Sequence, residues 1–307
     1  MNPGIPPLDT DNDGMPDSWE TFYGTQPGIA DDSRDIDTNG YTNIEEYINS
    51  LICDPTVIQP QQVEIAIKVF LQGPFDPNNG LMYSELRNQG LLPAVEPYTA
   101  LGFTHVNGGG ELVNSTILEV TGNNAIVDWI FIELRSGNDF TEVLATQSAL
   151  LQSDGDVVST DGISPVTFNG FPAGDYYVAI RHRNHLGIMT ANAYSLSHNI
   201  SEIDFTDGSA ATYGTEAQTQ VDGVKLMWVG DVNTDNQIKY SGQDNDRSLI
   251  LQLIGGSNIV STISGYHNED CNMDGIVKYS GSDNDRSIQL VNIGGAVITN
   301  VKIGQLP

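Results

Sequence analysis

Four acidic segments of this chain place side-chain oxygens at every second residue, and they occur as two pairs, one near each end. The first segment reads DTDNDGMPDSWE from residue 9, and the second reads DIDTNGYTNIEE from residue 35. Both have Asp or Asn at positions 1, 3, 5 and 9, Gly at position 6 and Glu at position 12. This spacing is that of an EF-hand loop, in which short side chains, the carbonyl of position 7 and a closing Glu surround a Ca²⁺ ion.

Two complete matches in tandem predict a calcium module over residues 1–54, with Ca²⁺ as the cofactor. Met15 and Tyr41, at position 7, are expected to act through their carbonyl oxygens. The predicted ligands are Asp9, Asp11, Asp13, Met15, Asp17 and Glu20 in the first loop, and Asp35, Asp37, Asn39, Tyr41, Asn43 and Glu46 in the second. A short helix is expected to begin inside each loop. The apolar residues expected to pack between these helices are Trp19, Phe22, Ile44, Tyr47 and Ile48.

The second pair of segments is an internal duplication, since residues 231–256 and 270–295 share the pattern D-x-N-x-D, the string KYSG and the string DNDRS. Position 12 falls on a glycine in each copy, so a four-residue insertion is expected to carry the closing carboxylate to Asp246 and Asp285. Rival closing residues are Asp244, Asn245, Asp283 and Asn284. The predicted ligands are Asp231, Asn233, Asp235, Gln237 and Asp246 in the first copy, and Asp270, Asn272, Asp274, Ile276 and Asp285 in the second, with Gln237 and Ile276 acting through carbonyls.

The middle of the chain contains short β-branched and aromatic runs separated by Gly, Asn, Asp and Pro. One such run is 116–120. The pattern predicts a mainly β fold: an antiparallel β-sandwich, Ig-like or jelly roll, flanked by small α-helical EF-hand-like calcium modules. The expected domains are the first calcium module over 1–54, a linker over 55–61, the sandwich over 62–229 and the duplicated module over 230–307. No linker separates the last two, so they are expected to pack as one unit.

Composition excludes several classes of partner. Asp and Glu number 40 against 12 Lys and Arg, a net charge of −28, which argues against nucleic acid and anionic membrane surfaces. No apolar run reaches the ~18 residues of a membrane span. The weak calcium sites of extracellular modules favour a location outside the cell or on its surface, as a fragment of a longer exported precursor. Cys53 and Cys271 form either a disulfide or two separate thiols.

The segment RHRNH over 181–185 concentrates cationic and imidazole groups in an acidic chain. It is interpreted either as a transition-metal site, a general base or a grip on an anionic sugar, or as a structural pairing of Arg and His with buried acceptors, which the pattern favours. Asp128, inside an apolar run, is expected to pair with Arg181. No nucleophile, phosphate-binding or zinc-protease motif is present, so no catalytic residue is predicted.

Three resemblances follow from these motifs. DTDNDGMPDSWE and NGYTNIEEYINSL resemble a calcium module attached to secreted polysaccharide lyases and related to thrombospondin type 3 repeats. The duplicated pattern resembles a type I dockerin, although the inserted YSG segment remodels the surface that would read a cohesin. LMYSELRNQGLLPAVEPYT, NNAIVDWIFIELR, YYVAIRHRNHLGIMT and the closing QLP resemble the ends of haemagglutinin-like surface proteins that accompany type IX secretion, which implies export and adhesion or assembly.

Together these features predict a non-enzymatic, calcium-stabilised module of an exported surface protein that acts in adhesion, display or extracellular assembly. Its expected partners are protein or glycan at the cell surface, with self-association as a further possibility. The alternative is a carbohydrate-binding module of a secreted polysaccharide-degrading enzyme. A third hypothesis is an enzyme that uses His182, His185 and Asp128.

Overall fold

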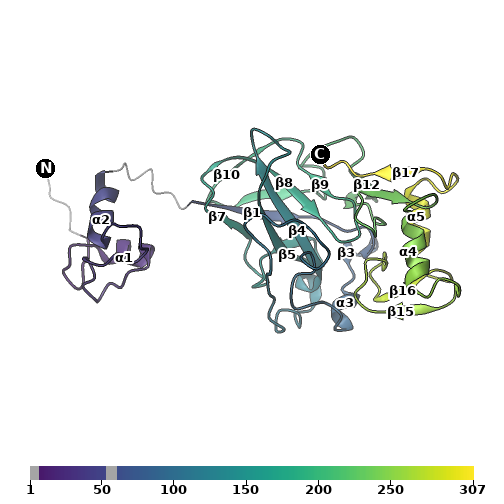
Figure 1. Ribbon diagram of the computed structural model, residues 1–307, viewed down its shortest axis with the longest axis horizontal. Coiled ribbons are helices and arrows are strands. Elements are labelled where there is room, and N and C mark those ends of the chain that lie inside the picture. The colour runs from purple at the N-terminus through teal and green to yellow at the C-terminus, as the bar shows by residue number, and fades with distance from the viewer. Residues whose placement is uncertain (1–6, 53–60) are drawn as a thin grey trace. The chain divides into compact units, whose positions relative to one another are not determined.

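The computed structural model describes residues 7–52 and 61–307 and divides into two compact units, Met1–Gln61 and Gln62–Pro307 (Figure 1). The boundary falls at the end of the predicted linker. Cys53 and residues 55–60 of that linker lie outside the described residues. The duplicated region and the strand-rich region belong to the same unit.

The first unit contains two helices, α1 (Asp17–Tyr23) and α2 (Asn43–Ile52). Helix α1 ends at Gly24, whose φ of +82° is favourable for glycine and lets its N–H bond back to the carbonyl of Glu20. Trp19 stacks on Tyr23 at 4.3 Å and meets the edge of Tyr47 at 5.4 Å, which joins the two helices. Phe22 and Ile48, expected between the helices, are instead 58% and 48% exposed.

The second unit is built on one large sheet that folds back on itself. Its strands are β1 (Gln62–Lys68), β4 (Ile126–Ser136), β5 (Val143–Gln152), β6 (Asp156–Val158), β7 (Val166–Asn169), β8 (Gly174–Arg181), β9 (Ile188–Met189), β10 (Tyr194–Leu196) and β11 (Ser201–Asp204). The smaller elements around it are β2 (Phe75–Asp76), β3 (Leu81–Met82), α3 (Glu85–Asn88), η1 (Gly122–Asn124), β12 (Gln218–Val221) and β13 (Val224–Met227). The expected strand over 116–120 is absent, since these residues form turns.

The sheet order is β10-β8-β4-β5-β6-β1-β11, with β7 also pairing β1 and β9 also pairing β8. Strand β6 pairs with both β5 and β1, so it connects a β10-β8-β4-β5 half to a half made by β7, β1 and β11. The β1–β11 pair is parallel, and the other pairs between the named strands are antiparallel. The prediction of a mainly β, antiparallel fold with small helices is confirmed, with this one parallel pair as an exception.

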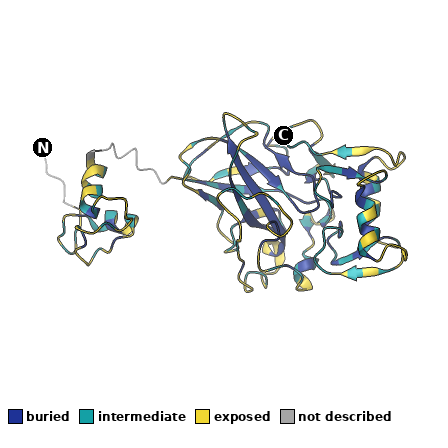
Figure 2. Ribbon diagram, viewed as in Figure 1, coloured by how far each residue is buried: buried dark blue, intermediate teal, exposed yellow. Residues whose placement is uncertain are grey.

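The core lies between the halves of the sheet, and β4 runs through its centre with all of its residues buried (Figure 2). The β-branched and aliphatic residues of β1 and β4 supply much of this core, since strand periodicity directs alternate side chains to one face. The other face of β4 is covered by the segment before η1. The Tyr98 hydroxyl donates to the carbonyl of Trp129 at 2.8 Å, and the Trp129 indole donates to the carbonyl of Pro93 at 2.9 Å.

The duplicated region forms two interlocked copies. The first copy contains β14 (Gln237–Lys239), α4 (Asp246–Leu253) and β15 (Thr262–Ser264), and the second contains β16 (Ile276–Lys278), α5 (Asp285–Asn292) and β17 (Val301–Ile303). Strand β14 pairs with β17, and β15 pairs with β16, so each copy completes the other's ladder. This exchange explains why the two copies pack as one body.

A buried polar cluster joins the sandwich to the second copy. Asp128 accepts from the Arg183 Nε at 2.9 Å and from the Tyr266 hydroxyl at 2.6 Å, and its Oδ2 lies 3.2 Å from the His182 Nε2. Burial alone would raise the pKa of Asp128, but Arg183, His182 and Tyr266 lower it to about 2. Asp128 therefore stays ionised and pairs with Arg183, whereas the expected partner Arg181 binds Glu133 at 3.2 Å.

His185 is also buried and held by structural contacts. The Gly73 backbone N–H donates to its Nε2 at 3.3 Å, and its Nδ1 faces the Asn184 Oδ1 at 2.8 Å. Burial lowers its pKa well below the usual value, and the nearby His182 and Arg183 add to that effect. The RHRNH segment thus acts as an internal connector, as the structural interpretation predicted.

The Arg183→Met variant tests this connector. It leaves the Asp128 carboxylate buried without its cation, so the free energy of unfolding should fall by about 3–5 kcal/mol. Arg181→Met is the matched control, because that side chain is 36% exposed and its ion pair with Glu133 is expected to contribute at most about 1 kcal/mol. Urea unfolding followed by circular dichroism measures both, and equal losses in the two variants would contradict the assignment.

Candidate metal centres

The four acidic loops share one backbone conformation although two of them lie in each unit. The residue at position 4 has a positive φ of 59–61° in every loop, at Asn12, Thr38, Thr234 and Met273. Position 6 is also left-handed, with Gly in three loops and Asn236, at φ +66°, in the third. Asn tolerates this region better than most residues with a side chain. The alternating oxygens are therefore presented by the same turn four times.

The same hydrogen bonds hold the side-chain oxygens in each of the four loops. In all four loops the position 6 N–H donates to the position 1 carboxylate, the position 5 N–H donates to the oxygen of position 3, and the position 7 N–H donates to the oxygen of position 5. The position 1 acceptors are Asp9, Asp35, Asp231 and Asp270, at 3.2, 2.9, 3.0 and 2.8 Å. The position 5 acceptors are Asp13, Asn39, Asp235 and Asp274, at 3.0, 3.0, 3.0 and 2.9 Å.

The first loop gathers two overlapping carboxylate groups. Asp9, Asp11 and Asp13 bring oxygens within 4.8 Å of one another, and Asp13 does the same with Glu20 and Asp31. Both oxygens of Glu20 are buried without a hydrogen-bond partner among the described residues. Burial raises the pKa of Glu20 to about 7, with Asp11, Asp13 and Asp31 adding to the shift. An ion with several oxygen ligands fits this arrangement.

Asp31 is a site residue that the loop pattern did not predict. It is 2% exposed, and its backbone N–H donates to Asp13 at 3.1 Å. Asp17, by contrast, is predicted as a ligand but is bound elsewhere, since its two oxygens accept from the N–H and the hydroxyl of Thr10, each at 2.7 Å. The structure therefore places Asp31 beside Asp13 and Glu20, whereas Asp17 braces the start of the loop.

The second loop is closed by Glu46, which accepts from the Asn39 side-chain amide at 2.8 Å. Asp37 accepts from the same amide at 2.9 Å, so three predicted ligands converge. Asn43 departs from its predicted role, because its amide donates to the backbone carbonyl of Asp31 at 2.8 Å and its Oδ1 accepts from the Ile36 N–H at 3.3 Å. It connects the two loops of the unit. Met15 and Tyr41, whose carbonyls are predicted ligands, occupy position 7, and their N–H groups donate to the position 5 side chains as described above.

The two later loops are closed by buried aspartates at the starts of α4 and α5. Asp246 accepts from the N–H groups of Val232 and Lys239 at 2.9 and 2.7 Å. Asp285 accepts from those of Cys271 and Lys278, each at 2.7 Å. Both carboxylates are 0% exposed and bridge positions 2 and 9 of their own loop.

The rival closing residues have other roles. Asn245 and Asn284 are the N-caps of α4 and α5, where their side chains accept from Ser248 and Ser287. Asp244 and Asp283 are exposed, and their backbone carbonyls accept from Asn233 and Asn272 at 3.2 and 3.0 Å. Position 3 is thereby anchored across each loop.

The inserted KYSG segment has a packing role. The Arg247 guanidinium lies over the Tyr240 ring at 4.8 Å, and Arg286 lies over Tyr279 at 4.6 Å. The Tyr of each insertion thus stacks on the Arg that follows the closing Asp, a contact of a kind that contributes about 0.5–2 kcal/mol. The insertion lengthens the loop while fixing the position of the closing carboxylate.

The buried carboxylates of these loops lack sufficient positive charge. Burial is the largest cause that raises the pKa of Asp231 to about 8, of Asp246 to about 7, of Asp270 to about 6 and of Asp285 to about 7. Lys239 and Lys278 pair with Asp235 and Asp274 at 3.6 and 3.1 Å, at position 5, rather than with these deeper groups. A bound divalent cation would supply the missing charge.

The fourth loop, residues 270–285, is seated on the sandwich. Its Met273 side chain is 1% exposed and belongs to the sandwich core. Asn184 donates to the carbonyl of Asp270 at 2.8 Å, and Gln89 donates to the carbonyl of Asp274 at 2.7 Å. Cys271, also in this loop, is buried, which raises the pKa of its thiol well above the usual value. The fourth loop is thus connected to the core of the sandwich.

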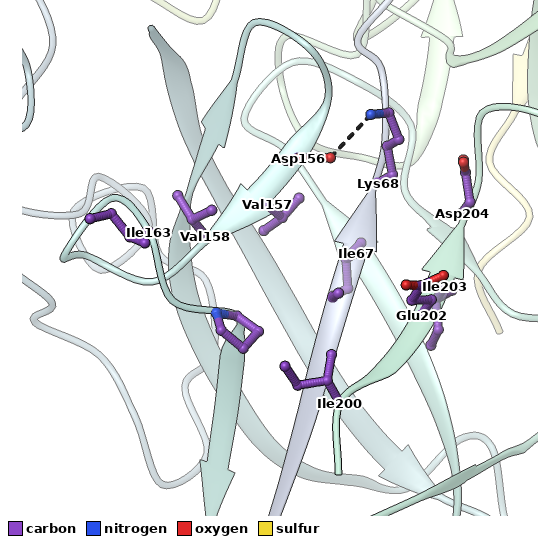
Figure 3. A pocket seen from close by; sticks show the side chains of 12 residues that line it. Ile67, Lys68, Asp156, Val157, Val158, Ile163, Ile200, Glu202, Ile203 and Asp204 are labelled. Carbon is purple, nitrogen blue, oxygen red and sulfur yellow. Dashed lines mark hydrogen bonds and ion pairs between the residues drawn. The ribbon is translucent and has the colours of Figure 1, made fainter. Parts of the chain in front are cut away.

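The second unit also has two surface pockets away from the loops. One has a volume of about 350 Å³ and lies over β1, β6 and β11, where Ile163, Ile200 and Val158 line it together with the Lys68–Asp156 ion pair (Figure 3). The other, of about 400 Å³, has a polar lining between β5 and β7. Neither contains a predicted site residue. Within the described residues, no helix combines the length and hydrophobicity needed to cross a membrane.

Part of the chain is similar to curated proteins that carry an enzyme name. Over 52 residues, 17% of this chain, it is 50% identical to proteins named probable pectate lyase C from Aspergillus flavus and Aspergillus oryzae. A protein of the same name from Emericella nidulans is 44% identical over 52 residues. The match covers 12% of each relative, so the chain corresponds to a small part of their length. No family model and no solved structure matches the chain.

These relatives correct one prediction. The sequence was expected to belong to a non-enzymatic protein, because no catalytic motif was found, whereas the matching proteins are named as a lyase, which is an enzyme. The prediction rested on the absence of familiar motifs, and such an absence does not exclude that a short segment of the chain is shared with proteins that carry an enzyme name. The name pectate lyase C describes those relatives and not this chain.

The pair Asp31→Asn and Asp17→Asn tests the revised first loop. Losing one charged ligand should weaken calcium binding at that loop by about tenfold or more, since ligand charge tunes affinity. Equilibrium dialysis at a free calcium concentration near the wild-type dissociation constant should show less bound calcium for Asp31→Asn and an unchanged amount for Asp17→Asn. The reverse order would restore Asp17 as the ligand.

Asp285→Asn and Asp246→Asn form a second matched pair, because the two side chains make equivalent hydrogen bonds. In saturating calcium we expect Asp285→Asn to lower the melting temperature by several degrees more than Asp246→Asn, because the fourth loop holds Met273 in the core. Differential scanning calorimetry measures both, with the exposed Asp283→Asn as the neutral control. Equal shifts for the first two variants would show that the seating of the fourth loop has no energetic consequence.

Proposed function

We propose that this chain is a calcium-stabilised module of an exported protein, with a role in adhesion, display or assembly outside the cell. The observation that carries the proposal is the repetition of one loop conformation four times, together with buried carboxylates in the first, third and fourth loops that lack sufficient cationic partners. Calcium at these loops would bind the folded state and not the unfolded chain, and so would stabilise it. Extracellular calcium is abundant enough for modules of this kind.

The mechanical role follows from where the loops lie. In the first unit, the two loops and a few aromatic contacts make up most of the structure. Calcium would therefore supply much of the stability that a hydrophobic core gives to a larger domain. In the second unit, the loops fix α4 and α5 against each other and against the sandwich. A rigid, calcium-dependent body suits a surface protein whose contacts must be held at fixed positions.

A second candidate function is glycan binding within a polysaccharide-degrading protein, and the match to proteins named pectate lyase C favours it. The matched length of 52 residues is close to that of the first unit, which supports a shared accessory module. Under this proposal the second unit would hold the protein on its polysaccharide. Glycan-array binding by the full chain would support this candidate, and a blank array would count against it.

Calcium removal tests the main proposal. With each site saturated about 100-fold above its dissociation constant, calcium contributes about 2.7 kcal/mol per ion, so EGTA should lower the melting temperature of the full chain by about 5–10 °C or more. Re-addition of calcium should restore it, and magnesium at the same ionic strength should restore it poorly, because Mg²⁺ demands a tighter octahedral site. A melting curve unchanged by EGTA would refute structural calcium binding.

A further inference from the structure

The polar pocket between β5 and β7 exists because the sheet splits there. Strand β6 pairs with β5 only at Leu150 and Leu151, while β7 pairs with β1. The rest of that β5 edge is left to a loop: the Thr146 N–H donates to the carbonyl of Val106 at 2.8 Å, and the Val106 N–H donates to the Thr146 hydroxyl at 2.9 Å. The result is an open mouth of about 400 Å³ between the two halves of the sandwich.

A close backbone approach fixes the rim of this mouth. A Cβ atom on Gly108 would lie 2.1 Å from the carbonyl oxygen of Thr146, so only glycine fits there. The loop beyond it then turns back and places Glu111 in the pocket, where its Oε1 accepts from the Gly109 N–H at 3.1 Å. The position of Glu111 is therefore set by the fold.

The chemistry of the lining suits a ligand rich in hydroxyl groups. The Oε2 of Glu111 is buried and has no hydrogen-bond partner among the described residues. The amides of Asn107, Gln147 and Asn169 share the pocket, and such groups both donate and accept. Phe171, at the turn after β7, is half-buried and offers an apolar ring surface beside them. A few convergent polar groups with one aromatic contact are typical of small-molecule sites.

The charge of the lining narrows the ligand class. Glu111 is its single ionisable residue, and no Lys, Arg or His lines the pocket in the part of the chain that the structure describes. A uronate would bring its carboxylate into an acidic protein of net charge −28 without a cation to meet it. An uncharged sugar instead offers hydroxyl donors to the free oxygen of Glu111.

We propose that this pocket binds one unit of a neutral saccharide, with Glu111, Gln147 and Asn169 bonding its hydroxyl groups and Phe171 contacting its apolar face. The proposal rests on the glycan-binding candidate above and deepens it, since it names the site and excludes polyuronate as the ligand of this pocket. The apolar pocket over β1, β6 and β11 lacks this set of amides around an unpartnered carboxylate.

The test uses isothermal titration calorimetry on the full chain in calcium, with neutral hexasaccharides of glucose, mannose, xylose and galactose and with hexagalacturonate. At least one neutral hexasaccharide should bind, and hexagalacturonate should bind at least about tenfold more weakly, a difference of about 1.4 kcal/mol. Gln147→Ala and Phe171→Ala should each weaken the neutral ligand by about tenfold. Glu202→Gln, which changes a charge in the other pocket, should leave the affinity unchanged.

Binding of none of the neutral sugars would overturn the proposal, as would binding that survives both pocket variants or a preference for hexagalacturonate. Each variant is first melted with calcium and with EGTA, which shows that it is folded. A folded chain that binds hexagalacturonate but no neutral sugar refutes this inference alone, whereas a folded chain that binds none of the sugars counts against the glycan-binding candidate as well. A chain without calcium dependence refutes the proposed structural role instead.

Discussion

The structure depends on carboxylates that are buried in tight loops without enough positive charge beside them. Removing a carboxylate from water costs several kcal/mol unless hydrogen bonds and a counter-charge replace the lost hydration. Asp231, Asp246, Asp270 and Asp285 accept hydrogen bonds from backbone N–H groups, yet burial still raises the pKa of each of them. A divalent cation bound at each loop would supply the missing positive charge.

The same carboxylates organise the architecture around them. In the duplicated region, each closing Asp begins a helix, and each copy lends a strand to the other. The fourth loop extends this order into the sandwich through Met273 and through Asn184, which follows the Arg183 that neutralises Asp128. One chain of contacts therefore runs from the fourth acidic loop to the central strand β4. We infer that the sandwich and the duplicated module behave as one cooperative unit for this reason.

Short-range chemistry was readable from the sequence, and long-range placement was not. The shared loop conformation could be predicted because Asp and Asn alternate within a few residues, and the choice of Asp246 and Asp285 followed from counting past a glycine that cannot ligate. Asp31 lies 18 residues from Asp13 and outside any repeat, so nothing in the pattern connects it to the first loop. Asp17 holds a ligand position in the pattern, but its carboxylate accepts from both the N–H and the hydroxyl of Thr10. These two hydrogen bonds set the direction of the Asp17 side chain.

In the fold, too, short-range features could be predicted from the sequence and long-range pairings could not. Alternating β-branched residues predicted a mainly β unit, but a pattern in one strand cannot show that β1 and β11 pair in parallel or that β6 joins the two halves. The pairing of Asp128 with Arg183 rather than Arg181 depends on which face of the chain turns inward after β8. The exposure of Phe22 and Ile48 reflects a first unit too small to enclose every apolar side chain that its helices carry.

The most direct test of the account is a crystal structure of the full chain grown in calcium, with anomalous diffraction used to locate the ions. The account predicts an anomalous peak at the centre of each of the four loops. Asp31 should lie beside the first peak, and Asp246 and Asp285 should contact the peaks of the later loops. Loops 231–246 and 270–285 that keep the present conformation without a peak would contradict the claim that their buried carboxylates are there to hold calcium.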